Sequence, residues 1–270
     1  MPKTFYSIAL PQTSLEFIGI VYKSRSDPEV HVYIGNPTIQ QRPCVHIGVD
    51  EKTHEANLYA LDYAATCNIE RNMPGGKEGT IPMLHGAIQL ARHVDPQLKR
   101  LTFTDNSGFY PKPHQHVILS DWSILQYGQT WYERALHPYP MHPQNKKDRS
   151  LVNEYRDILQ DYERFEPEMR KDRDYNRSHS WNEYFQMKKQ SHTDDSFLVY
   201  NQDMLPIMRR LFKLPTLYGI TWRANITSYI SDPFFTIRPL SKNTHKGFKV
   251  FWGGRRNIGQ GPWDSLGKYE

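Results

Sequence analysis

The sequence predicts an α/β fold, with a mixed, twisted β-sheet and a helical or irregular C-terminal extension. Three observations predict it. A short apolar segment, a glycine-containing loop, an amphipathic helix and a second strand follow one another between residues 58 and 105. Strand-like segments precede this unit, and a stretch rich in Pro, His and Lys follows it at residues 137–149. We therefore divide the chain into an α/β core, residues 1–148, and an interface-forming extension, residues 149–270.

The segments before this unit have the composition and spacing of strands. They are Leu15–Lys23, His31–Gly35 and Cys44–Val49, and the prolines between them indicate turns. In the third segment, apolar residues at alternate positions are separated by His46 and Gly48. Such alternation is typical of a strand with one buried face, so three strands are expected here.

The central unit begins and ends with a strand. Leu58–Tyr63 is short and apolar and is followed by turn-forming residues, which predicts a buried strand. Lys99–Asp105 predicts the second strand, because Leu101 and Phe103 are two positions apart and lie on one face.

The helix of the central unit is predicted over Ile81–Val94, because its apolar residues recur three or four positions apart. Thr80 is expected to cap the helix, and Asp95-Pro96 is expected to end it. If one face packs on the sheet, the helix buries Leu84 and Ile88 and exposes Gln89 and Arg92.

The loop between strand and helix is the main candidate binding site. It spans residues 74–80, with glycines at positions 75, 76 and 79. In a strand–loop–helix unit, free backbone N–H groups at the start of the helix point toward a ligand beyond the strand. Because many folds hold a pyrophosphate in this way, the loop decides whether the chain is an enzyme with a nucleotide-like cofactor.

Shorter segments follow the central unit. Val117–Gln126 is apolar and predicts another strand, and Thr130–Leu136 predicts a short helix. In the extension, Leu151–Phe165 predicts an amphipathic helix, and residues 181–214 predict further helices. We therefore expect residues after about Ser150 to contribute little to the sheet and to contact other chains or wrap the core.

Composition favours a protein that binds other proteins. Aromatic residues make up 13% of the chain, including 17 tyrosines, and Tyr and Arg are enriched at protein interfaces. The alternative is a loop-rich monomer with aromatic side chains on its surface. The net charge of +5 permits nucleic-acid binding, but no basic stripe supports it. Cys44 and Cys67 are too few for a disulfide scaffold or a four-cysteine zinc site.

No apolar run is long enough for a signal peptide or a membrane span, so we expect a protein that is not secreted. No metal site is expected either. His114 and His116 share one face of a strand, and His137 and His142 are near in sequence. A zinc site needs a third or fourth ligand at a defined offset, which this segment lacks.

The order of these elements resembles the core of GNAT-type N-acetyltransferases. Three short motifs are similar to those of a protein family of large nucleocytoplasmic DNA viruses that has a GNAT-like core. They are Gly79-Thr80 before the helix, Asp105-Asn106-Ser107 after the second strand, and Gly128-Gln129-Thr130-Trp131-Tyr132-Glu133. The resemblance covers roughly a third of the chain by the spacing of its elements.

Within a GNAT enzyme, the loop amides of Gly75, Gly76, Gly79 and Thr80 would bind the pyrophosphate of acetyl-CoA. The resemblance also implies Tyr132 as the general acid that protonates the departing thiolate. No general base stands out in the sequence, and Asp105 and Glu133 are the two possible ones. This chain departs from the GNAT pattern, because two residues instead of one separate Gly76 from Gly79. The second of them is Glu78, whose carboxylate would repel a pyrophosphate.

Two functions of different class therefore remain open. The first is a non-enzymatic structural protein of a large DNA virus particle, such as a minor capsid or capsid-associated protein. Its partners would be other chains of the particle, its location the virion or host cytoplasm, and it would need no cofactor. The second is an active acyltransferase that moves an acetyl group from acetyl-CoA to an amine.

Overall fold

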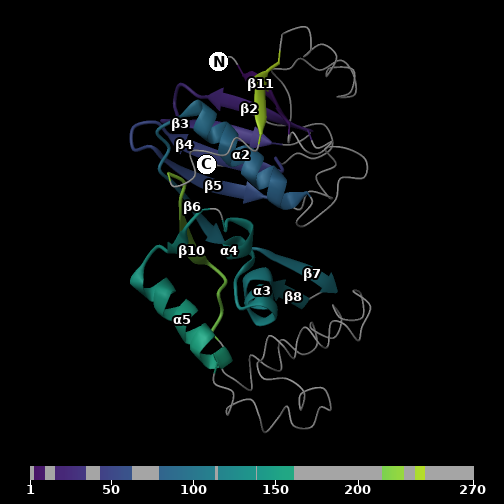
Figure 1. The fold of residues 1–270 in the computed structure, drawn as a ribbon, viewed down its shortest axis with the longest axis vertical. Helices are drawn as coiled ribbons and strands as arrows, with labels where there is room; N and C mark the ends of the chain where they lie inside the picture. Colours follow the sequence, from purple (N-terminus) through teal and green to yellow (C-terminus); the bar gives the residue numbers. More distant parts are fainter. Residues whose placement is uncertain are drawn as a thin grey trace. The chain divides into compact units, whose positions relative to one another are not determined.

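The computed structural model forms two compact units (Figure 1). The described residues are 3–9, 16–34, 43–62, 79–112, 115–137, 139–160, 215–227 and 235–240. Unit 1 comprises residues 1–103, 138–140 and 224–270, and unit 2 comprises residues 104–137 and 141–223. The predictions for the loop residues 74–78 and for the helices over residues 161–214 lie outside the described residues.

One mixed sheet contains nine strands in the order β11-β1-β2-β3-β4-β5-β6-β10-β9. The strands are β1 (Thr4–Ala9), β2 (Glu16–Lys23), β3 (Glu29–Ile34), β4 (Val45–Asp50), β5 (Glu55–Leu61), β6 (Arg100–Asp105), β9 (Met141–Pro143), β10 (Ile220–Asn225) and β11 (Thr236–Pro239). A separate two-stranded sheet pairs β7 (Gly108–Lys112) with β8 (Gln115–Ile118). The α/β class, the mixed sheet and the five strands predicted up to residue 105 are confirmed, with small shifts in their bounds.

Strands β1 to β5 form an antiparallel meander, and β5 pairs with β6 in parallel. A parallel pair needs a crossover, which here is the helix α2 (Thr80–Val94). The parallel register joins Glu55–Asn57 to Arg100–Thr102. The register between β4 and β5 shifts between His46 and Ile47, which marks a β-bulge or irregularity.

Helix α2 packs against β2, β3 and β4 and lies across these strands in Figure 1. Its predicted core face is confirmed, because Leu84 and Ile88 are 0% and 1% exposed. Gln89 and Arg92 are half-buried instead of exposed, so the helix sinks further into unit 1 than its periodicity indicates.

The predicted cap of α2 is wrong. Gly79 occupies the N-cap position, and no side chain caps the helix there. Thr80 is instead the first helical residue and is buried. The carbonyl of Gly79 accepts the N–H of Met83 at 3.0 Å, so the helix begins one residue earlier than predicted. The predicted end is confirmed, because Asp95 is the C-cap and its N–H donates to the carbonyl of Ala91.

Unit 2 contains a helix where the sequence predicts a strand. Only the start of the segment 117–126 belongs to β8, and Leu119–Tyr127 forms the helix α3. A short apolar run does not distinguish a buried strand from a buried helix, because both can bury every side chain. Gly128 ends α3 with φ of 70°, a left-handed conformation that glycine adopts without strain.

Two further helices of unit 2 have side-chain caps. α4 (Trp131–Ala135), predicted over Thr130–Leu136, begins with a capping box formed by Thr130 and Glu133. α5 (Lys146–Gln160) begins five residues before its predicted start. Its Asp148 N–H donates to Asn145 Oδ1 at 2.8 Å, while Asp148 Oδ2 accepts the N–H of Thr221 at 2.9 Å and links α5 to β10.

The expectation that residues after about Ser150 contribute little to the sheet is wrong, because β10 and β11 belong to it. In β10 the buried residues alternate along the strand, and Trp222 is only 1% exposed. This strand is six residues long, and its polar residues Thr221 and Arg223 separate the apolar ones, so it contains no continuous apolar run.

Two further observations concern the chemistry of the chain. Cys44 is buried and disulfide-bonded, and the second cysteine of the chain, Cys67, lies outside the described residues. Among the helices that the structure describes, none combines the length and the apolar character needed to cross a membrane.

Candidate functional site

The two residues implied as catalytic, Asp105 and Tyr132, both lie in unit 2. Asp105 is the last residue of β6 and is 0% exposed, and Tyr132 in α4 is 7% exposed. Burial and, to a smaller degree, the charge of Asp105 raise the pKa of Tyr132 well above its usual range. The structure therefore brings the two side chains into the same interior and encloses both.

The Asp105 carboxyl is fixed by its own turn. Its Oδ1 accepts the N–H of Ser107 at 3.0 Å and also the Ser107 hydroxyl. Its Oδ2 is buried and has no hydrogen-bond partner within the part of the chain that is described. Burial raises the pKa of Asp105 to about 6, against the two bonds from Ser107 and the nearby Ser120 hydroxyl, which lower it. A charge at this position is therefore costly at neutral pH.

The residues expected to bind acetyl-CoA are described only in part. Gly79 and Thr80 are buried at the start of α2, whereas Gly75, Gly76 and Glu78 lie outside the described residues. Of the histidines weighed as metal ligands, His137 and His142 are exposed, and His137 Nδ1 lies 3.2 Å from the carbonyl of Arg134.

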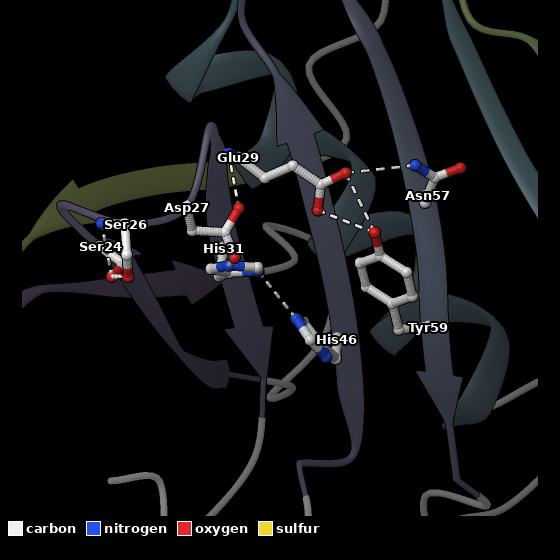
Figure 2. A network of polar contacts seen from close by, with 8 residues as sticks. All are labelled: Ser24, Ser26, Asp27, Glu29, His31, His46, Asn57 and Tyr59. Carbon is white, nitrogen blue, oxygen red and sulfur yellow. Dashed lines mark hydrogen bonds and ion pairs between the residues drawn. The ribbon is translucent and has the colours of Figure 1, made fainter. Parts of the chain in front are cut away.

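A second polar cluster lies on unit 1, where the sequence analysis placed no site. It comprises Asp27, Glu29, His31, His46, Asn57 and Tyr59, and we call it the His31 cluster (Figure 2). Its residues come from the turn before β3 and from β3, β4 and β5.

Register places the His31 cluster on the face of the sheet that α2 does not cover. Ile34 pairs with Gly19, and a Cβ at Gly19 would lie 2.4 Å from Leu90 of α2. Side chains alternate along a strand, so His31 points away from α2. Directly paired residues share a face, and Tyr33 pairs with His46, which brings the two histidines to the same side.

The centre of the cluster is a chain of two imidazoles and a carboxylate. His31 Nε2 lies 2.8 Å from Asp27 Oδ2, and His31 Nδ1 lies 3.1 Å from His46 Nε2 (Figure 2). Asp27 is held in turn, because its Oδ1 accepts the backbone N–H of Glu29 at 2.9 Å. An ionised Asp27 accepts from His31 Nε2–H, which leaves His31 Nδ1 to accept from His46 Nε2–H.

The charges of the cluster follow from these contacts. Burial and then the neighbouring His31 lower the pKa of His46 to about 4, so His46 is neutral at pH 7. The N–H of Glu29 and, less strongly, His31 hold the pKa of Asp27 below its usual value. Burial and the bond to Glu29 raise the pKa of Tyr59 to about 12. At pH 7 the cluster thus combines a neutral His46 ring with an ionised Asp27.

Glu29 reaches across β4 to bind β5. Its two carboxylate oxygens accept the Tyr59 hydroxyl at 3.0 and 2.8 Å, and Asn57 Nδ2 donates to Oε1 at 3.3 Å. The path crosses Gly48, where a Cβ would lie 2.0 Å from Glu29 Oε2. Within the described residues, neither Glu29 nor Asp27 pairs with a lysine or arginine.

The arrangement therefore brings one imidazole and two carboxylates near one another. One ligand atom from each of Asp27, Glu29 and His31 lies within 4.8 Å of the other two. The sequence carries a signal for this group, since the three residues alternate as Asp-x-Glu-x-His. The predicted strand began at His31 and so omitted the two acids.

Comparison of the chain with protein-family models, with curated proteins and with solved structures finds no match in any of the three. The function is therefore argued from the residues and their geometry.

Proposed function

We propose that the chain is a non-enzymatic structural protein of a large DNA virus particle, a minor capsid or capsid-associated protein on a GNAT-like scaffold. The observation that carries the non-enzymatic part is the burial of Asp105 and Tyr132. The viral part follows from the resemblance of the three short motifs.

The enclosed position of Tyr132 argues against acid catalysis. A general acid must come within about 2.6–3.2 Å of the atom it protonates, and its pKa should lie near the working pH. Tyr132 is 7% exposed, and burial makes its hydroxyl a weaker acid than an ordinary tyrosine. The same burial gives Asp105 no open route to a substrate among the described residues.

The motif residues that carry the resemblance have structural contacts in unit 2. Gly128 ends α3, Thr130 and Glu133 cap α4, and Asp105 holds the turn at Ser107. Glu133 also pairs with Arg156 of α5. These contacts give the motif residues a structural role in the folding of unit 2. Such a role is what we expect in a scaffold protein of a particle.

A GNAT-like core is supported by the connection through α2. A parallel pair with a helical crossover follows an antiparallel meander, and a loop and a helix N-terminus follow β5. The described parallel register ends at Asn57 and Thr102, so it gives Leu58–Leu61 of β5 no partner on β6. Unpaired backbone groups suit an extended ligand, and this observation favours the alternative, an acetyl-CoA-dependent acyltransferase.

Titration of acetyl-CoA separates the two functions, and we expect no binding by the wild-type chain. A helix N-terminus favours an anion by about 0.3–1 kcal/mol, and by up to about 2 kcal/mol in sheltered geometry. A carboxylate about 4 Å from each ligand charge opposes it by about 1 kcal/mol in water and about 4 kcal/mol at an effective dielectric near 20. With Glu78 in the loop, repulsion should therefore match or exceed the attraction.

Calorimetry should compare the wild type with Glu78→Gly and Glu78→Gln. The glutamine variant removes the charge alone, whereas the glycine variant also frees the backbone. Binding restored in the variants only would indicate an acetyltransferase scaffold that has lost its ligand. Micromolar binding by the wild type would make the acyltransferase the leading function, and Tyr132→Phe would then be assayed for lost turnover. Mass spectrometry of purified particles tests the structural role, which stoichiometric presence supports and absence contradicts.

A further inference from the structure

We propose that Asp27, Glu29 and His31 bind a divalent transition-metal ion, Zn²⁺, on the face of the unit 1 sheet opposite α2. The site is independent of the proposed particle role and of acetyl-CoA. It is formed by the turn before β3 and by β3 itself, with supporting residues on β4 and β5.

The distances fit a metal with small rearrangement. Zn²⁺ binds imidazole nitrogen and carboxylate oxygen at about 2.0–2.2 Å, so tetrahedral ligand atoms lie about 3.3 Å apart. Asp27 Oδ2 and His31 Nε2 are 2.8 Å apart and share a proton. An ion that replaces this proton needs the two atoms to separate by roughly half an ångström. One Glu29 oxygen, within 4.8 Å of both residues' ligand atoms, moves closer as the third ligand, while the other keeps the Tyr59 hydroxyl.

Each ligand already has a partner that orients it, as metal ligands usually do. The Glu29 N–H holds Asp27, and Tyr59 and Asn57 hold Glu29. His46 Nε2 holds His31 at 3.1 Å. When His31 Nε2 binds the ion, its Nδ1 carries the proton and donates to His46, so the bond remains with its direction reversed. This requires the tautomer of His46 that carries its proton on Nδ1 and leaves Nε2 free to accept.

Charge also favours a cation at this point. Asp27 and Glu29 bring two carboxylates together, and neither has a lysine or arginine partner in the described part of unit 1. A divalent ion would neutralise both. Mixed nitrogen and oxygen ligands favour Zn²⁺ and related transition metals over Ca²⁺, which takes six to eight oxygens. Three protein ligands leave one position for water.

The test is calorimetric titration of Zn²⁺ into the full chain after treatment with a chelator, with Co²⁺ absorption spectra as a second readout. We expect one site of micromolar or tighter affinity in the wild type. His31→Gln and Asp27→Asn should each weaken it by more than about tenfold, since they remove ligands whereas loss of an orienting residue alone costs about 10–100-fold.

The matched control is His54→Gln. His54 Nδ1 also lies 2.8 Å from an aspartate oxygen, Asp95 Oδ2, but outside the His31 cluster. Zn²⁺ affinity should be unchanged in this variant. Equal losses in His54→Gln and His31→Gln, or no Zn²⁺ binding by the wild type, would overturn the proposal.

Gly48→Ala tests the geometry without removing a ligand. The new methyl would displace the tips of Glu29 and Tyr59 and leave the backbone in place, so the fold should persist even where the ligand variants do not fold. We expect Zn²⁺ affinity to fall by about tenfold, as for lost support of a ligand. Unchanged affinity in Gly48→Ala would exclude Glu29 as a ligand.

Discussion

Replacement of Leu84 by alanine is expected to lower the free energy of unfolding by about 2–5 kcal/mol, the usual cost of truncating a buried leucine. Leu84 is 0% exposed on the face of α2 that packs against β2, β3 and β4. The truncation removes apolar contact and leaves a cavity that the surrounding strands cannot fill completely. Urea denaturation followed by circular dichroism measures the change.

Gln89→Ala is the matched control on the same helix. Gln89 is half-buried, and its one described bond, to the Tyr139 hydroxyl, is long at 3.4 Å. The change should therefore shift stability by less than about 1 kcal/mol. A larger loss in Gln89→Ala than in Leu84→Ala would mean that α2 buries a different face from the one that its periodicity indicates.

Hydrophobic periodicity predicted α2 and the strands β2 to β6, but neither β1 nor β11 of unit 1. The helix α2 is long enough for its apolar stripe to recur over several turns, and in β4 the apolar residues Val45, Ile47 and Val49 stand at alternate positions. These patterns arise because each element buries one face, so the sequence records them. The caps are less predictable, since Thr80 and Gly79 occupy adjacent positions and backbone geometry alone decided between them.

The elements that the sequence did not predict lack a hydrophobic periodicity that identifies them as helix or strand. α3 lies within an apolar run whose composition fits a buried helix and a buried strand equally well. β10 is short. β11 pairs with β1, which is far from it in the sequence, so the pairing of β11 depends on tertiary contacts. The local propensity of a segment for helix or strand does not predict which distant strand it pairs with.

The sequence indicated candidate site residues, but it did not predict their burial or their neighbours in the fold. The motifs that carry the resemblance contain both Asp105 and Tyr132, and the structure brings them together, but only packing determines that both are buried. The His31 cluster needs the register that sets His46 opposite Tyr33. That register depends on the connection between β3 and β4, whose residues 35–42 contain no two-residue hairpin sequence and lie outside the described residues.

Asp105→Asn is expected to stabilise the protein above pH 6 and to have little effect near pH 4. Burial raises the pKa of Asp105 from 3.8 to about 6, so the folded state binds this proton more tightly than the unfolded state. The resulting stability is fully present below about pH 4 and is lost as the pH rises through 6. A hundredfold difference in proton affinity corresponds to about 3 kcal/mol, which sets the largest expected gain at pH 8.

Urea denaturation at pH 4, 6 and 8 measures this prediction. Asparagine keeps the Oδ1 that accepts the two bonds from Ser107, so the variant removes the charge and preserves the turn. Asp50→Asn is the control: Asp50 also accepts backbone N–H groups, but these bonds lower its pKa, so the same substitution should not stabilise the protein at pH 8. If Asp105→Asn instead destabilises the protein at pH 8, the ionised carboxylate must have a favourable partner, and a functional role for Asp105 would replace the structural one.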